Sequence, residues 1–426
     1  MGYRDIYKES NEQAEERFSL VMERIAEIAE ETDVPEKFDD YFKKTAAFLL
    51  QLKNVSEKAE KDTLKDASLT ECEKQNAGFY DDIKAENYGK SYGNPTYAVE
   101  KLGEEYGQIL SALYAECRKR ITDAYAAKKM NVTITAELFV EIYNYFEDKE
   151  GIDKTAIEQA IYWYFHDYSE IFIGDSVREL VDSEEDFLYQ IVMNSDLNDL
   201  RYLYQYGQHI GKNETGIAAF LNGMSDEEIQ AMADTYTEGY RIGFAATGKD
   251  LSKKTTAQVR YPIGFERMVR AAVKNLEKLN LKVTMRACSS AANKQYDYDH
   301  KEDKALYYDK AYVERRLEVM KTSFEEMKKL ANGQAGPAVI EVFGEIPFSP
   351  ETKKEVLKLD EKQQQLSVYD MSMSGQITNQ YIIGEERSFT IIAYPVPEIG
   401  EKFEEIFAET VKINTLDYTL YQNMQQ

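Results

Sequence analysis

The chain has 426 residues, of which 43% are apolar, and its 52 Lys and Arg face 77 Asp and Glu, so the formal charge is −25. This length is typical of two or three domains, and the apolar fraction is sufficient for packed cores. Nucleic acids and anionic membranes attract proteins through Lys and Arg, so neither is expected as a partner of such an acidic chain.

The three cysteines, Cys72, Cys117 and Cys288, are widely spaced and odd in number. This pattern fits neither a disulfide framework nor a CxxC metal or redox site. The N-terminal residues form no apolar signal segment, and no apolar run approaches the ~20 residues that cross a bilayer. We therefore expect a soluble, cytoplasmic protein.

Charge and proline content change together near residue 245. Residues 1–245 contain 26 basic and 50 acidic side chains and two prolines, whereas residues 246–426 contain 26 basic and 27 acidic side chains and six prolines. These shifts predict a multidomain chain with a boundary there. The acidic region 1–245 is expected to be all-α, with two subdomains that could meet near Met130.

Helical patterns dominate the first region. An apolar stripe runs from Phe18 to Ala29, and a second from Leu102 to Ile121 is opened by Asn94-Pro95 as a cap and first-turn proline. Ser225-Asp-Glu-Glu228 forms a capping box that predicts a helix over about 229–244. The pattern Gly239-Tyr-Arg-Ile-Gly243 in that helix is expected to allow close backbone packing near its end.

The second region alternates short β-rich runs with longer helical stretches, which predicts βαβ crossovers. The expected strands are 256–261, 282–288, 338–343 and 388–396, and the expected helices are 264–279, 303–330, 351–366 and 398–411. Region 246–426 is therefore predicted to be an open α/β domain with a mostly parallel sheet. Met373-Ser-Gly375 is interpreted as a loop. The stripe from Leu416 to Met424 indicates either a frayed final helix or a chain that continues into another domain.

No motif for metal or phosphate chemistry is evident. His166, His209 and His300 lie far apart, and neither a Walker A loop nor a G-x-G-x-x-G follows any expected strand. The local acidic cluster, Asp297 to Asp303, could hold a hard cation. The favoured interpretation is a solvated loop in which Asp303 caps the next helix.

Two further features allow alternative interpretations. Cys288 lies at a strand end, where open α/β sheets place ligand sites, but a buried structural thiol is favoured. The 32 tyrosines include those in Ile161 to Tyr168 and in Tyr202 to Tyr206, which could line a groove for a peptide or sugar. Core packing is the favoured role for these tyrosines as well.

Several segments of residues 246–426 resemble, in order, the thermophilic metalloprotease family of aminopeptidase T and leucyl aminopeptidase-like enzymes. The first matching segment, Gln258 to Val283, resembles the first strand-helix-strand unit of that family. Further matches are Tyr308 to Tyr312, Ala338 to Pro347, Phe389 to Pro395, and Leu416 to Gln426, which resembles the segment leading into the family's catalytic domain. The chain departs from the family in its acidic helical region and in Val396-Pro-Glu-Ile, where Trp-Ala often stands.

The resemblance implies a metal-dependent aminopeptidase that releases N-terminal amino acids from peptides. Its dinuclear centre, with two divalent ions of the zinc or cobalt type bound by Glu, His, Asp and Tyr, would follow Gln426. No catalytic, cofactor-binding or metal-binding residue is therefore assigned within this chain, which alone should be inactive. The region present would wall off the active site or form the surface of a homodimer.

Two other functions are compatible with the sequence. One is a non-catalytic acidic helical scaffold that presents a tyrosine-rich surface to a protein partner. The other is an α/β domain that binds a small molecule and is regulated by the helical region.

Overall fold

A computed structural model describes residues 2–147 and 151–415. Residues 1–245 form helices, as predicted, and the apolar stripe that begins at Phe18 lies on the buried face of α1. The α-helices that precede the sheet are α1 (Tyr3–Ile28), α2 (Glu36–Glu60), α3 (Leu69–Tyr80), α4 (Pro95–Leu102), α5 (Gly107–Tyr125), α6 (Lys129–Phe146), α7 (Lys154–Asp167), α8 (Ser169–Val181), α9 (Phe187–Asn194), α10 (Lys212–Gly223) and α11 (Asp226–Ala246).

Capping residues set several of these helix ends. Asn94 caps α4 as predicted, but the chain turns at Gly103, where φ is +88°, and α5 begins at Gly107. The second predicted stripe is therefore divided between two helices, because glycine tolerates the left-handed region that ends α4. Ser225 and Glu228 form the predicted capping box of α11, with the Glu228 N–H 3.2 Å from the Ser225 Oγ.

The second region contains a four-stranded, fully parallel sheet, which confirms the predicted fold class. Its strands are β1 (Thr256–Pro262), β2 (Lys282–Cys288), β3 (Gln334–Phe343) and β4 (Thr390–Pro395). Their order in the sheet is β2-β1-β3-β4. Each predicted strand is present, although β3 begins four residues earlier than its apolar run suggests.

The helices of this region are α12 (Glu266–Lys278), α13 (Lys294–Asp299), α14 (Lys310–Glu326), α15 (Lys328–Asn332), α16 (Glu361–Tyr381) and α17 (Phe403–Asn414). The predicted helix 351–366 is wrong in its bounds, because α16 begins only after Asp360, whose carboxylate accepts from the Gln363 N–H at 2.8 Å. The predicted loop at Met373-Ser-Gly375 is also wrong. Residues 373–375 lie inside α16. Gly375 faces open space there, because nothing lies within 4 Å of a Cβ placed on it.

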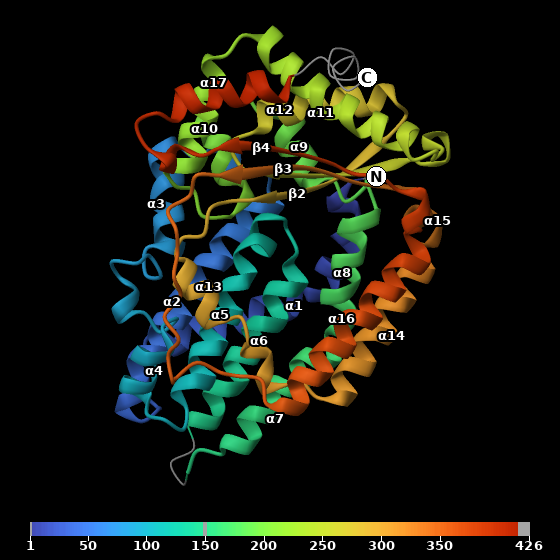
Figure 1. Cartoon of the computed structure of the whole chain (residues 1–426). Coiled ribbons are helices and arrows are strands. Elements are labelled where there is room, and N and C mark those ends of the chain that lie inside the picture. The colour runs from blue at the N-terminus through green and yellow to red at the C-terminus, as the bar shows by residue number, and fades with distance from the viewer. Residues whose placement is uncertain (1, 148–150, 416–426) are drawn as a thin grey trace.

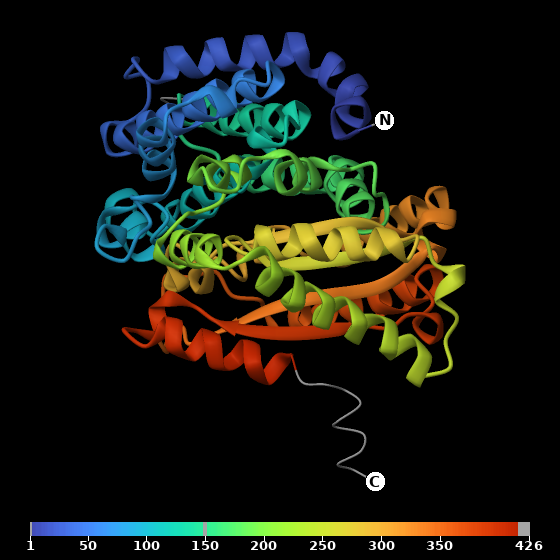
Figure 2. The ribbon, with the colours of Figure 1, turned by 90° about the horizontal axis from the view of Figure 1, so that it is seen from above.

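Helices cover the sheet on both faces. In Figure 1, α11, α12 and α17 lie above the strands and α8 lies below them. Figure 2, seen from above, shows α1 and α17 on opposite sides of the molecule. Gly243 of α11 allows the predicted close approach, because an added Cβ would lie 2.5 Å from the Ser388 Oγ.

Two large apolar cores stabilise the molecule. One joins buried side chains from α1 to α7, including residues on both sides of Met130. The other contains the inner residues of all four strands together with α9 to α11, so that Tyr236 and Tyr240 of α11 pack in the same core as Val259 of β1. The core of the sheet thus extends across residue 245. None of the helices within the described ranges is long and apolar enough to span a membrane.

Candidate functional site

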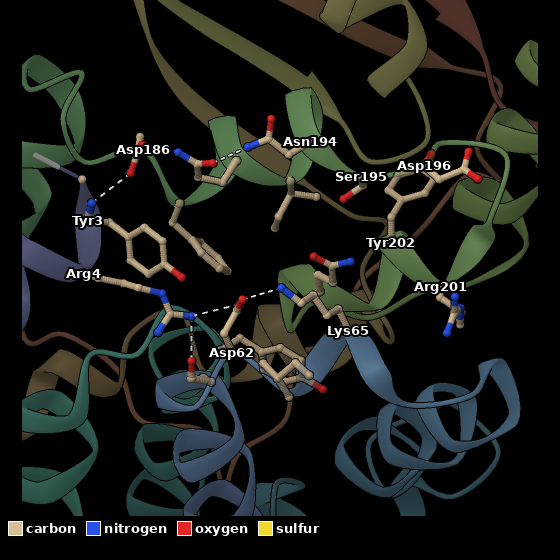
Figure 3. Close-up of a pocket in the computed structure, with 18 of the residues that line it drawn as sticks. Tyr3, Arg4, Asp62, Lys65, Asp186, Asn194, Ser195, Asp196, Arg201 and Tyr202 are labelled. Atoms are coloured by element: carbon tan, nitrogen blue, oxygen red, sulfur yellow. Dashed lines mark hydrogen bonds and ion pairs between the residues drawn. The ribbon is translucent and has the colours of Figure 1, made fainter.

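A cleft of about 740 Å³ lies between the start of α1, the end of α2, α9 and the short helix η3 (Leu200–Tyr206). Figure 3 shows its two walls facing one another across open space. The lining side chains include three cations, five carboxylates and several aromatic rings. They come from residues 2–5, 59–65 and 186–205, together with Tyr125.

The first wall is formed where α1 meets the end of α2. The Arg4 guanidinium donates to the carbonyl oxygens of Ala59 at 2.7 Å and Glu60 at 3.1 Å, and so places a positive charge against the carbonyl end of α2. Asp62 accepts from Arg4 at 3.4 Å and is also paired with Lys65. Both of these cations remain partly exposed, and their outer surfaces face the cleft.

The second wall consists of α9 and η3. Asp199 caps η3, and its carboxylate accepts from the Nε of Arg201 at 2.7 Å. This contact holds the pKa of Asp199 below its usual value. Arg201 also donates to the carbonyl oxygen of Ala67 at 3.2 Å, which links η3 to the segment after α2. Asp196 is exposed at the rim of the same wall (Figure 3).

The floor of the cleft is largely apolar. Tyr3 and Phe187 meet edge to face with ring centroids 5.3 Å apart, and Leu64 and Ile191 extend this surface. The Tyr3 N–H donates to the Asp186 carboxylate at 2.9 Å, which fixes the start of α1 against α9. An apolar floor between walls that each carry both cations and carboxylates can hold a ligand that has both an apolar group and charged ends.

Tyr202 connects this cleft to a buried carboxylate, Glu266, at the start of α12. Its hydroxyl donates to Glu266 at 2.9 Å, and the Gly264 N–H donates to the same carboxylate oxygen at 2.8 Å. Glu266 is fully buried, and desolvation raises its pKa to about 7. Its second oxygen has no hydrogen-bond partner within the described residues. Sequence analysis missed Glu266, because it looks like an ordinary acid in the first turn of a helix.

The acidic cluster at 297–303 is not the solvated loop that was predicted. Asp299 is 1% exposed and accepts from the Tyr88 hydroxyl at 2.7 Å and the Lys353 ammonium at 2.6 Å. Asp303 binds the Nδ1 of His300 at 2.7 Å instead of capping the next helix, which is capped by Asp309. The error arose because the partners of Asp299 come from distant segments. Asp299 therefore joins distant parts of the chain, with Lys353 as its partner, and Asp303 pairs with His300.

Cys288 is exposed, so its predicted burial is wrong, whereas Cys72 and Cys117 are buried. On strand β2, side chains alternate between buried and exposed faces, and residue 288 is on the exposed one. The carboxyl end of β2, where open α/β sheets commonly bind ligands, is covered by the loop before α10. Gln208 of this loop accepts from the Ser289 N–H at 2.9 Å, and Glu214 accepts from the Ser290 N–H at 2.6 Å.

Core packing accounts for most of the tyrosines that were singled out. Tyr202, Tyr204 and Tyr206 are buried in the core of the sheet, and Tyr164 is buried among the N-terminal helices, as the favoured interpretation predicts. Trp163 differs from these tyrosines, because 52% of its surface is exposed.

The described residues do not supply the donor set of a dinuclear metal centre. Ligand oxygens of Glu31, Asp33 and Glu147 lie within 4.8 Å of one another. However, Arg24 pairs with Glu31 at 2.7 Å and with Glu147 at 3.0 Å, so a guanidinium already provides the positive charge. The three histidines bind elsewhere: His166 to Asp167, His209 to the Ser290 carbonyl, and His300 to Asp303 and the Gly93 carbonyl.

The fold and the cleft define a helical protein that carries a small open α/β sheet and a mixed polar and apolar cleft beside it. Comparisons with models of protein families, with curated proteins and with solved structures find no significant match to this chain.

Proposed function

We propose that the chain is the substrate-admitting, non-catalytic part of a metal-dependent aminopeptidase, and that it holds peptides in the cleft between α1 and α9. Residues that follow Gln426 would supply the dinuclear metal centre. The segmental resemblance between residues 246–426 and the aminopeptidase T family supports the reaction class. The chemistry of the cleft supports the peptide as its ligand.

The observation that carries the proposal is the arrangement of charges around an apolar floor. Lys65 and Arg201 can attract a carboxylate, and Asp196 on the opposite side from Lys65 can attract an ammonium group (Figure 3). The rings of Tyr3 and Phe187 line the same cleft and can contact an apolar side chain. A short peptide with an apolar residue combines these three features, whereas a purely anionic ligand would face the carboxylates.

Calorimetric titration of the 426-residue chain with Leu-Gly-Gly tests the binding step. We expect saturable binding that weakens about fivefold in Asp196→Asn and about fivefold in Lys65→Gln, since each substitution removes one partly exposed charge contact of about 1 kcal/mol. N-acetylated peptide should lose the dependence on Asp196. Glu16→Gln, an exposed carboxylate on the outer face of α1, serves as the matched control and should leave binding unchanged.

Absence of binding to the wild-type chain would refute the role of the cleft. The reaction class needs a separate test on the protein encoded by the complete reading frame. That protein should release leucine from leucyl-p-nitroanilide in a metal-dependent manner. A stop codon directly after codon 426, together with no metal-dependent release by the chain, would refute the assignment to an aminopeptidase while leaving peptide binding intact.

A further inference from the structure

A second concave surface, the α6–α7 groove, lies among the N-terminal helices and has a volume of about 440 Å³. Its walls are one face of α6 and one face of α7. The side chains that define its chemistry are Glu137, Glu141, Tyr145, Trp163, Asp167 and Tyr168. In Figure 1, α7 and α17 lie at opposite ends of the molecule.

The groove is lined by three carboxylates, and no Lys or Arg is among its lining residues. Glu137 is already occupied, because it forms a two-pronged ion pair with Arg17 of α1. Glu141 accepts only a long hydrogen bond of 3.3 Å from Tyr145, and Asp167 contacts only the ring of His166, at 3.0 Å. Within the described residues, Glu141 and Asp167 therefore have no Lys or Arg partner.

The aromatic side of the groove is formed by Trp163, the single tryptophan of the chain. Its ring is about half exposed and is held edge to face by Tyr162 and His166, each with ring centroids 5.2 Å away. These contacts limit the motion of an exposed indole. An aromatic face attracts cations, and indole does so most strongly among the aromatic side chains.

We propose that the α6–α7 groove binds a basic segment of a partner polypeptide, with an Arg or Lys side chain placed against Trp163 and its charge near Glu141 and Asp167. Charge complementarity favours this occupant, because Glu141 and Asp167 have no Lys or Arg partner within the described residues and line the same groove as the exposed Trp163. Arg17, by contrast, engages Glu137 and Tyr168 at the α1 side. The negative charge of the surrounding region also attracts a basic segment, since residues 1–245 carry 50 acidic and 26 basic side chains. The α6–α7 groove lies apart from the cleft between α1 and α9, so this inference does not depend on the proposed function.

The single tryptophan makes the test specific, because intrinsic fluorescence excited at the indole band reports on the α6–α7 groove alone. The probes are tetra-arginine amide and, as the oppositely charged control, tetraglutamate. We expect a saturable change in Trp163 emission with tetra-arginine that weakens as salt is raised, and none with tetraglutamate. Calorimetric titration with the same probes detects any binding that leaves the emission unchanged.

A pair of double variants separates local from long-range effects. Glu141→Gln with Asp167→Asn should weaken tetra-arginine binding about 25-fold, since two exposed charge contacts of about fivefold each are lost. Glu401→Gln with Glu404→Gln, near α17, removes the same total charge and should change binding less than twofold. The proposal is overturned if neither fluorescence nor calorimetry detects tetra-arginine, if tetraglutamate binds equally well, or if the two double variants weaken binding equally.

Discussion

Replacing Glu266 by glutamine is expected to remove the contribution of this carboxyl group to the pH dependence of the free energy of unfolding. Glu266 is fully buried at the start of α12, and desolvation raises its pKa from 4.5 to about 7. The folded state therefore holds a proton on Glu266 between about pH 4.5 and pH 7 that the unfolded state has lost. Stability linked to this group is greatest below pH 4.5, falls as the pH rises to about 7, and is constant above that.

The size of this effect follows from the same values. A shift of two to three units corresponds to about 3 kcal/mol, because one unit is worth about 1.4 kcal/mol. Glutamine retains an oxygen that can accept from the Tyr202 hydroxyl and the Gly264 N–H, and it never ionises. The free energy of unfolding of Glu266→Gln should therefore exceed that of the wild type by about 1 kcal/mol at pH 5 and by about 3 kcal/mol at pH 8.

Urea unfolding followed by far-ultraviolet circular dichroism at pH 5 and pH 8 measures the difference. Wild type and variant share all other titrating groups. The difference between their free energies of unfolding should therefore change between pH 5 and pH 8 only through Glu266. Glu404→Gln removes an exposed carboxylate on α17 and should reproduce the wild-type pH dependence. If Glu266→Gln and the wild type lose equal stability between pH 5 and pH 8, the carboxylate is not desolvated and the reasoning fails.

Three other substitutions probe the fold. Gly264→Ala should lower the melting temperature by several degrees, because φ is +109° there and a Cβ would lie 2.8 Å from the Glu214 carbonyl oxygen; an unchanged melting curve would contradict this. Asp299→Asn should lower the free energy of unfolding in urea by about 3 kcal/mol, since it leaves the Lys353 ammonium without its buried carboxylate. A loss below about 1 kcal/mol would show that water solvates this pair. Phe42→Ala should cost about 4 kcal/mol by the same assay, because it empties the centre of an aromatic cluster, and near-neutral behaviour would indicate a loosely packed core.

Local patterns predicted much of the fold because they involve neighbours in sequence. The mostly apolar run 338–343 correctly indicates the strand β3, although it is not buried on both faces, because Glu341 and Phe343 are exposed. The Ser225 capping box marks the start of α11 correctly. The bounds of α16 were missed, because few of its side chains are buried and its apolar residues therefore form no clear stripe. In this case the cap at Asp360 was the better signal.

The candidate sites could not be predicted in the same way, since their members are distant in sequence. The cleft is lined by both Arg4 and Arg201, and the burial of Asp299 depends on Tyr88, which lies 211 residues earlier in the chain. Glu266 is surrounded by Tyr202 and by the turn at Gly264, so its raised pKa is a property of tertiary packing. Trp163 is a partial exception, because a groove was the alternative interpretation of the aromatic run from 161 to 168, although core packing was the favoured one.

The change of charge at residue 245 and the packing of the core lead to a further prediction. On α11, Ile229, Met232, Tyr236, Tyr240 and Phe244 are buried in the core that also contains the inner residues of the sheet. A fragment of residues 1–245 would expose this apolar stripe to water, at a cost of roughly 25 cal/mol per Å². We therefore expect the fragment to bind the dye ANS and to self-associate in size-exclusion chromatography, whereas the full chain should do neither. A monomeric fragment that does not bind the dye would show instead that the acidic helices fold independently of the sheet, so that the boundary in charge is also a boundary in stability.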